Sequence, residues 1–308
     1  MRNLFTIFFL FFLWSLSFPL GKMMLAYAPP IFLTAIRMLF AGVLLVGYSC
    51  IRKKLNRITK PILLSFVILG FFNIYLANIL ELWSLSKITA AKTCFLYSLT
   101  PFLAALLSYF HFGERMTKLK WLGLSIGFVG FLPTIWAKDG SELSLGTIAY
   151  FSLPEIAMFF AVLSSAYGWV LLRLIVKEEV SPLVANGFSM LIGGILALGT
   201  SFFLDPWNPH PIAPGSLGIL LGLITILTLL SNIFCYNLYG FLLKKYTATF
   251  LSLFGLLSPV FTAFHSWILL DETPPLSIFL STVIIIVGLF IVYKEETKQG
   301  YITQETPD

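Results

Sequence analysis

Long apolar runs with few charges recur along the whole chain. About 20 apolar residues cross the hydrocarbon core of a bilayer as a helix, and ten runs approach or exceed that length. Lipid cannot satisfy exposed backbone groups, so such runs form helices or closed barrels. These runs are long and lack period-two alternation, and only 11% of the residues are charged. The sequence predicts an all-α integral membrane protein whose ten transmembrane helices span 4–21, 31–51, 61–82, 89–110, 119–136, 153–175, 183–203, 217–241, 247–270 and 276–293.

Lysine and arginine are unevenly divided between the loops. With the N-terminus inside, fifteen of them fall in segments on that side, whereas only Lys22, Lys87 and Lys138 fall outside. The positive-inside rule therefore predicts that both termini are cytoplasmic. The net charge of +6 follows this topology and does not indicate a nucleic-acid partner.

Features of the first half return in the second half at a fixed spacing. Pro101 and Pro259 are 158 residues apart, and so are Glu114 and Glu272. Each copy holds five spans, so the second copy enters the membrane from the opposite side. The sequence predicts two inverted five-helix repeats.

The predicted units are residues 1–138 and 146–293, followed by a cytoplasmic tail at 294–308. Inverted repeats underlie alternating access, with the substrate near the middle of the membrane. Pro101 and Pro259 are predicted to kink their helices and act as gating hinges, since neighbouring helices can satisfy the freed carbonyl.

Several motifs accompany the repeat. A proline and a glutamate separated by twelve residues close the fourth and ninth spans, glycine-bearing spans follow, and "LWSLSFPLGK" and "RMLFAGVLL" lie in the first two spans. Together they make the chain resemble EamA-type carriers of the drug/metabolite transporter superfamily over essentially its whole length. The resemblance implies a secondary carrier in the inner membrane of a bacterium, with a cavity lined by both halves. It does not identify a substrate.

Charges inside the predicted spans are the first candidates for substrate contact, because each costs roughly 2.5–3.5 kcal/mol to insert. Arg37 lies about 10 Å into the second span, and its counterpart in the second half is Ser189. Lys92 lies one turn into the fourth span, and its counterpart is Phe250. We predict that both cations bind an anionic group of the substrate. The alternatives are a structural Arg37, and a Lys92 that forms an ion pair or extends to the outer interface.

Two acids receive different interpretations. Glu81 shares a helical stripe with Asn73, and we predict that both residues contact the substrate. Glu81 would hold an ammonium or pair with Lys92; alternatively it is an acid at the outer interface. Glu155 follows the helix start "SLPE" and is predicted to complete a capping box.

Aromatic residues complete the predicted site. Trp14, Trp169 and Tyr236 are candidates for stacking on a planar base or holding a cation, although aromatic stripes in lipid are more often packing residues. His265 in the ninth span is a candidate for proton coupling because histidine titrates near neutrality. A neutral, hydrogen-bonded histidine is the alternative.

Other protein classes find little support. "GLSIG" matches the G-x-S-x-G expression but lies in an apolar helix, where no nucleophile elbow forms. The three cysteines have no metal spacing, so neither a metal nor a cofactor is predicted. We predict a secondary transporter that moves a small zwitterionic amino-acid-type or nucleoside-bearing metabolite, such as S-adenosylmethionine, with a proton or a counter-substrate as a further partner. Efflux of amphipathic drugs or excess amino acids is the alternative, and a membrane-embedded enzyme is a remote one.

Overall fold

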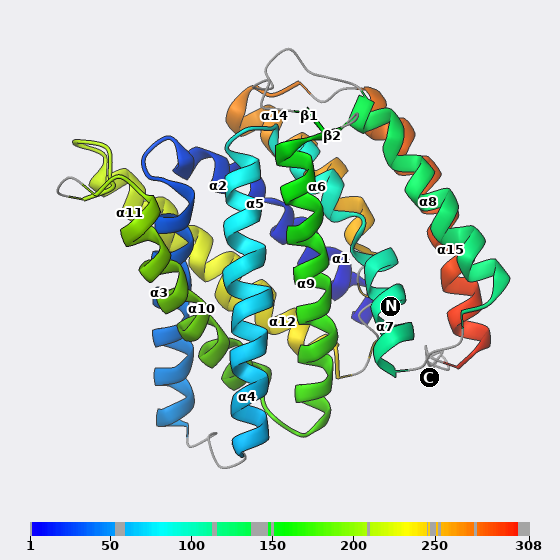
Figure 1. Cartoon of the computed structure of the whole chain (residues 1–308), viewed down its shortest axis with the longest axis horizontal. Coiled ribbons are helices and arrows are strands. Elements are labelled where there is room, and N and C mark those ends of the chain that lie inside the picture. Colours follow the sequence, from blue (N-terminus) through cyan, green and yellow to red (C-terminus); the bar gives the residue numbers. More distant parts are fainter. Residues whose placement is uncertain are drawn as a thin grey trace.

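The computed structural model describes residues 2–52, 59–112, 116–136, 147–148, 151–207, 210–244, 246, 251, 254–273 and 276–300. Helices make up nearly all of this part (Figure 1). The exception is a pair of two-residue strands, β1 (Thr147–Ile148) and β2 (Phe151–Ser152), which pair antiparallel. The predicted boundary at 138–146, Glu114, Phe250 and the last part of the tail, 301–308, lie outside the described residues. The helices are α1 (Arg2–Ser15), α2 (Ser17–Leu25), α3 (Pro30–Ile51), α4 (Lys60–Leu69), η1 (Gly70–Leu76), α5 (Ala77–Leu85), α6 (Ala90–Tyr97), α7 (Thr100–Phe112), α8 (Lys118–Trp136), α9 (Leu153–Lys177), α10 (Pro182–Leu204), α11 (Leu217–Leu227), η2 (Thr228–Cys235), α12 (Tyr236–Leu242), η3 (Gly255–Leu257), α14 (Ser258–Leu270) and α15 (Leu276–Lys298).

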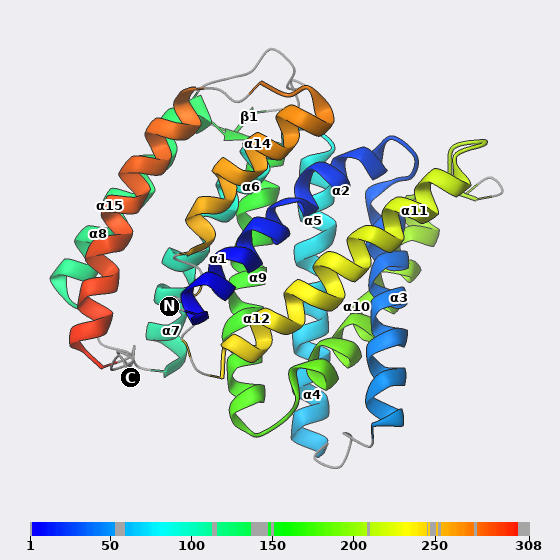
Figure 2. The same cartoon turned by 180° about the vertical axis from the view of Figure 1, so that it is seen from behind.

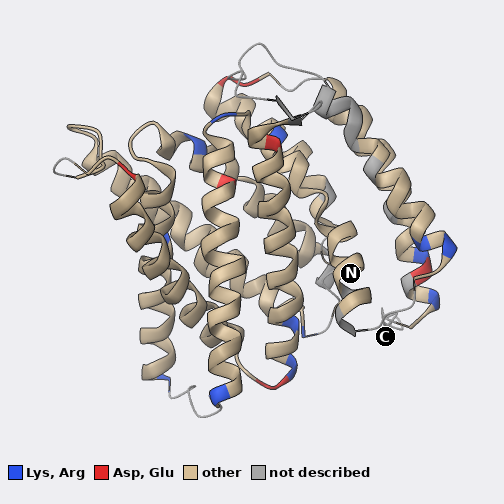
Figure 3. Cartoon of the chain, in the orientation of Figure 1, with Lys and Arg blue, Asp and Glu red and all other residues tan. Residues whose placement is uncertain are grey.

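Eight described stretches are long and apolar enough to cross a membrane. Two further predicted spans, 119–136 and 247–270, correspond to α8 and to the shorter apolar helix α14. Figure 3 shows that charged residues lie mainly near helix ends, with long uncharged stretches between them. The eight stretches are Phe5–Leu25, Pro30–Ile51, Lys60–Leu85, Ala90–Leu107, Leu153–Lys177, Pro182–Leu204, Leu217–Leu242 and Leu276–Glu295.

Helices from the two halves pack against each other in pairs. α3 lies along α10, and α8 lies along α15 at one edge of the molecule (Figure 2). At the α3–α10 contact, a Cβ atom added to Gly42 would lie 2.8 Å from the backbone nitrogen of Leu191. A Cβ atom added to Gly194 would lie 2.9 Å from that of Leu39. Only glycine allows so close an approach at either position. The contact is reciprocal, because each helix presents a glycine to a leucine of the other.

The start of α3 is fixed by the loop that follows α10. Asp205 Oδ2 accepts hydrogen bonds from the Phe32 backbone N–H (2.8 Å) and from Ser201 Oγ (2.7 Å). Burial raises the pKa of the Asp205 carboxyl, and these two hydrogen bonds oppose that rise. The Ala213 N–H further donates to Tyr27 O at 2.8 Å. These contacts hold the N-terminal end of α3, the helix that carries Arg37, against the loop that follows α10.

Breaks in the helices occur where the sequence places prolines and short polar residues. α6 ends at Tyr97 and α7 begins at Thr100, next to Pro101. Proline has no N–H to donate to the carbonyl four residues earlier, and the Thr100 hydroxyl donates to Tyr97 O instead, at 2.6 Å. The 3₁₀ turn η3 precedes Pro259 in the same way. Each predicted hinge proline thus follows a helix break, and its role in gating stays a prediction.

Candidate functional site

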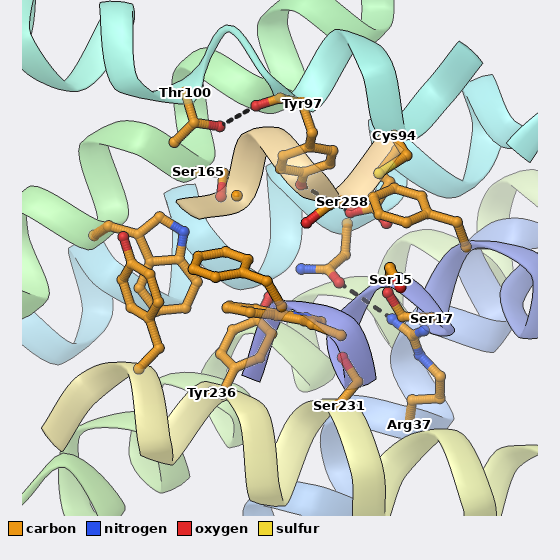
Figure 4. Close-up of a pocket in the computed structure, with 18 residues that line it drawn as sticks. Ser15, Ser17, Arg37, Cys94, Tyr97, Thr100, Ser165, Ser231, Tyr236 and Ser258 are labelled. Atoms are coloured by element: carbon orange, nitrogen blue, oxygen red, sulfur yellow. Dashed lines mark hydrogen bonds between the residues drawn. The ribbon is translucent and has the colours of Figure 1, made fainter. Parts of the chain in front are cut away.

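A cavity lies among the helices, and the space between its walls is about 820 Å³, including a part that is open to the outside. Its walls come from α1, α2, α3, α5, α6 and α7 in the first half and from α9, η2, α12, η3 and α14 in the second. Figure 4 shows Arg37, Tyr97 and Tyr236 approaching it from different sides. Helices from both halves therefore build one site.

One wall of the cavity carries charge. Arg37 is only 6% exposed, and its Nη2 donates to Asn78 Oδ1 at 3.2 Å. Its Nε has no hydrogen-bond partner among the described residues. Glu81 lies close enough to act electrostatically on Arg37, but in the described part of the chain the two form no direct ion pair. Instead, the Tyr97 hydroxyl donates to Glu81 Oε2 at 2.8 Å.

The position of Asn78 depends on the π-helical segment η1. Hydrogen bonds in a π-helix skip one residue more than in an α-helix, and such segments are frequent at functional sites. Asn78 Nδ2 donates to the backbone oxygen of Asn73, five residues earlier, at 3.0 Å. Asn78 is therefore held from behind while its Oδ1 accepts from Arg37.

The same segment changes the predicted role of Asn73. The stripe from Asn73 to Glu81 assumed an uninterrupted α-helix, whereas η1 shifts the register between them. Asn73 is 1% exposed and does not appear among the described residues that line the cavity; it packs against Gly168 of α9. Its Oδ1 accepts from Ser165 Oγ at 3.4 Å. The structure thus places Asn73 behind the cavity wall. Asn78, not Asn73, lines the cavity beside Glu81.

Four aromatic rings form another wall. Trp14, Trp169, Tyr236 and Tyr239, here called the aromatic cluster, come from α1, α9 and α12. The ring centroids of Trp169 and Tyr239 lie 4.6 Å apart, and those of Trp14 and Tyr236 lie 5.4 Å apart. The sequence selected the first three of these residues, and the structure places all three on the cavity.

Lys92 lies outside the cavity lining. Its Nζ lies 2.9 Å from Glu155 Oε1, and the two side chains are only 3% and 4% exposed. Glu155 also accepts from the Ser152 backbone N–H at 2.6 Å and completes the predicted capping box of α9. The suggested pairing of Glu81 with Lys92 is replaced by this one, because the first turn of α9 brings Glu155 to α6.

His265 lies next to the break in the first span. Its Nδ1 is 3.1 Å from Ser15 Oγ, and Thr262 Oγ1 donates to Ser15 O at 3.2 Å. Ser15 lines the cavity and is the last residue of α1, whereas His265 is not among the described lining residues. This contact fits a hydrogen-bonded histidine, and proton coupling stays a prediction.

Sequence reasoning missed Asn78 and Tyr97. Asn78 and Glu81 are three residues apart on α5 and so share a helical face, which was a usable signal. Tyr97 reaches Glu81 only because α6 packs beside α5, and no local pattern predicts that contact.

Comparison with known families agrees with this architecture. The sequence model of the EamA-like transporter family matches residues 1–136 and 152–294. The chain belongs to this family. It is a multi-pass membrane transporter rather than an enzyme. The resemblance drawn from the sequence motifs is confirmed.

Relatives with curated names match nearly the whole chain. The S-adenosylmethionine/S-adenosylhomocysteine transporter of Chlamydia muridarum is 35% identical over 97% of this chain and 94% of its own length. The transporter of the same name in Chlamydia trachomatis serovar L2 is 36% identical over 97% and 91%. A solved crystal structure matches with a TM-score of 0.69 at 19% identity, covering 95% of this chain and 97% of that one. That likeness concerns the fold alone.

Proposed function

We propose that this chain carries S-adenosylmethionine (SAM) and S-adenosylhomocysteine (SAH) across the inner membrane of a bacterium. The observation that carries the proposal is the cavity, which has an aromatic cluster on one wall and a buried arginine and glutamate on another. The two Chlamydia relatives, named as transporters of these compounds, support it.

The chemistry of the ligand matches the two walls. The adenine ring can stack on the aromatic cluster, and the sulfonium can lie against the same ring faces by cation–π attraction. The α-carboxylate suits Arg37, since charge-assisted hydrogen bonds to guanidinium are among the strong ones, and the α-ammonium suits Glu81. Because Arg37 lines the cavity and Lys92 does not, Arg37 takes the anionic group.

SAH differs from SAM only in the methyl group and charge on sulfur, so it fits the same cavity. Methyl transfer from SAM yields SAH, so a cell that consumes imported SAM must remove SAH. A single site that accepts both compounds allows one to leave as the other enters.

We further propose that the fold consists of ten spans in two inverted repeats, residues 1–138 and 146–293, which exchange roles in alternating access. The reciprocal packing of Gly42 against Leu191 and of Gly194 against Leu39 supports a two-fold relation between the halves, and so does the pairing of α8 with α15. The loop charges support cytoplasmic termini and a cytoplasmic tail, 294–308. Reporter fusions after residue 57 and at the C-terminus should report the inside, and fusions at Lys138 and His210 the outside.

Uptake of labelled SAM into proteoliposomes tests the function. We expect saturable uptake that internal SAH accelerates and external SAH inhibits. Adenosine lacks the amino-acid end and methionine lacks the nucleoside, so each should compete much less well. Liposomes with the Trp169→Ala variant provide a matched control with a disrupted aromatic cluster. If amphipathic drugs or free amino acids were transported and SAM were not, the efflux alternative would replace this proposal.

A further inference from the structure

The charges that line the cavity are balanced. Among the described lining residues, Arg37 and Glu81 are the only ones of ordinarily charged residue types. The other lining groups are aromatic, apolar, thiol, amide or hydroxyl groups. A charge inside a membrane protein needs a partner, so this pair matches a ligand region that itself holds one negative and one positive group.

Both charged residues have an unused polar atom. Arg37 Nε is buried without a hydrogen-bond partner among the described residues, and an orphaned buried donor is costly unless a ligand satisfies it. Glu81 receives its bond from Tyr97 on Oε2, and Oε1 accepts none from the described part of the chain. Figure 4 shows Arg37 extending from α3 toward the centre of the cavity, with Tyr97 across from it. This arrangement is complementary to an α-carboxylate beside an α-ammonium.

Among the described lining residues, the only acid near the aromatic cluster is Glu81, which acts electrostatically on Tyr236 and which the amino-acid end of the ligand already uses. Its four members are two indoles and two phenols, with centroids of neighbouring rings 4.6–5.7 Å apart. Ring faces attract a cation through their quadrupole but contribute no opposite charge. The same faces also accept a neutral thioether and an adenine ring.

We infer that the carrier neutralises the amino-acid end of its ligand and leaves the sulfonium charge unbalanced. This inference rests on the proposed function. SAM carries two positive groups and one negative group, whereas SAH carries one of each. Import of SAM against export of SAH therefore moves one net positive charge inward in every cycle. An inside-negative membrane potential drives SAM in and SAH out, with no coupling ion.

A compensating proton would remove this effect. Glu81 is the acid in position to take a proton with SAH and release it with SAM; Arg37, Tyr97, Tyr236 and Cys94 are the titratable groups around it. His265, next to Ser15, is the other candidate. If either group carried a proton with SAH, the exchange would be electroneutral and would follow the pH gradient.

The test uses the purified full-length protein in proteoliposomes loaded with SAH, with labelled SAM outside. Valinomycin and potassium gradients set the membrane potential, and a separate series sets a pH gradient at zero potential. The quantity measured is the final inside-to-outside ratio of SAM multiplied by the outside-to-inside ratio of SAH. Exchange of SAH for labelled SAH is the control, because a neutral ligand on both sides moves no charge.

We expect this product to rise tenfold for each ~60 mV of inside-negative potential, or about 50-fold at 100 mV, as for one charge crossing the membrane. The pH gradient should leave this product unchanged. In the control, the final distribution of labelled SAH should be the same at every membrane potential. The His265→Asn variant should give the same slope, whatever its rate.

A product that ignores potential and follows the pH gradient would overturn the inference while leaving SAM transport intact. An absence of SAM uptake would instead overturn the proposed function. The two failures are thus distinguished within one preparation.

Discussion

Arg37 and Lys92 are both buried cations in the first half of the chain, yet their surroundings differ. Arg37 faces the cavity, bonds a neutral amide at 3.2 Å and keeps one nitrogen without a partner among the described residues. Lys92 lies outside the cavity lining and has a buried carboxylate, Glu155, at 2.9 Å. The first arrangement leaves a donor that we propose a ligand satisfies, and the second already contains its counter-ion.

This difference shows what the loss of repeat symmetry can and cannot indicate. In the proposed pair of repeats neither cation recurs, because Ser189 and Phe250 occupy the corresponding positions. Under that proposal, the asymmetry indicates that the fold of one repeat does not need the charge. The asymmetry alone does not distinguish a ligand contact from an ion pair. A counter-ion beside the cation, as at Lys92, makes that distinction.

The largest effect is expected from breaking the buried ion pair. The Lys92→Met variant leaves Glu155 buried and unpaired, which should cost roughly 3–5 kcal/mol of stability. Thermal unfolding of the detergent-purified protein measures this loss.

The double variant Lys92→Met with Glu155→Gln should recover most of that stability, because glutamine can still complete a capping box. If Lys92→Met were as stable as the wild type but bound SAM weakly, Lys92 would be a ligand contact and the comparison would fail.

A smaller effect, on binding rather than on stability, is expected at Arg37. The Arg37→Gln variant keeps a donor for Asn78 and removes the charge. Loss of a charge-assisted hydrogen bond of roughly 1.5–3 kcal/mol should lower SAM affinity by about one to two decades, with the unfolding temperature nearly unchanged.

Ser189→Ala, at the equivalent position of the second half, is the matched control for Arg37→Gln. Ser189 Oγ donates to Ala185 O within its own helix, so SAM affinity should be retained. Equal losses of affinity in the two variants would show that Arg37 has no special role.

The smallest effect is expected at a hydrogen bond between two neutral side chains, Asn186 and Asn237, in the second half. Asn186 Nδ2 donates to Asn237 Oδ1 at 3.1 Å and so links α10 to α12, much as Arg37 links α3 to α5. Hydrogen bonds between membrane helices average roughly 0.6 kcal/mol. Asn186→Ala should therefore lower the unfolding temperature slightly and leave SAM affinity intact. A large loss of affinity would place this hydrogen bond in the binding site.

Much of the fold could be predicted because membrane spans leave a strong composition signal. Apolar length located the eight described spans, and the pattern around Pro101 and Pro259 located two helix breaks. Each proline removes one particular backbone hydrogen bond, so its effect is local and readable from sequence.

Less of the site could be predicted, because its contacts depend on register and on packing between helices. Asn73 was assigned to the cavity by an α-helical period that η1 interrupts. Lys92 was assigned to the substrate because it is a charge within a span and its counterpart Phe250 has none; its partner Glu155 is 63 residues away in sequence and already had a capping role. Arg37, Glu81 and the aromatic residues lie on the cavity as predicted, and their contact with a substrate stays a prediction.

The most direct test compares SAM with its decarboxylated analogue in the wild type and in Arg37→Gln. If Arg37 binds the α-carboxylate, SAM should lose about one to two decades of affinity in the variant. The analogue should bind both proteins about equally, so that the two changes are not additive. If the loss from the variant and the loss from the analogue simply multiply, Arg37 does not contact the carboxylate, and the assignment of this cavity to the amino-acid end of the substrate is wrong.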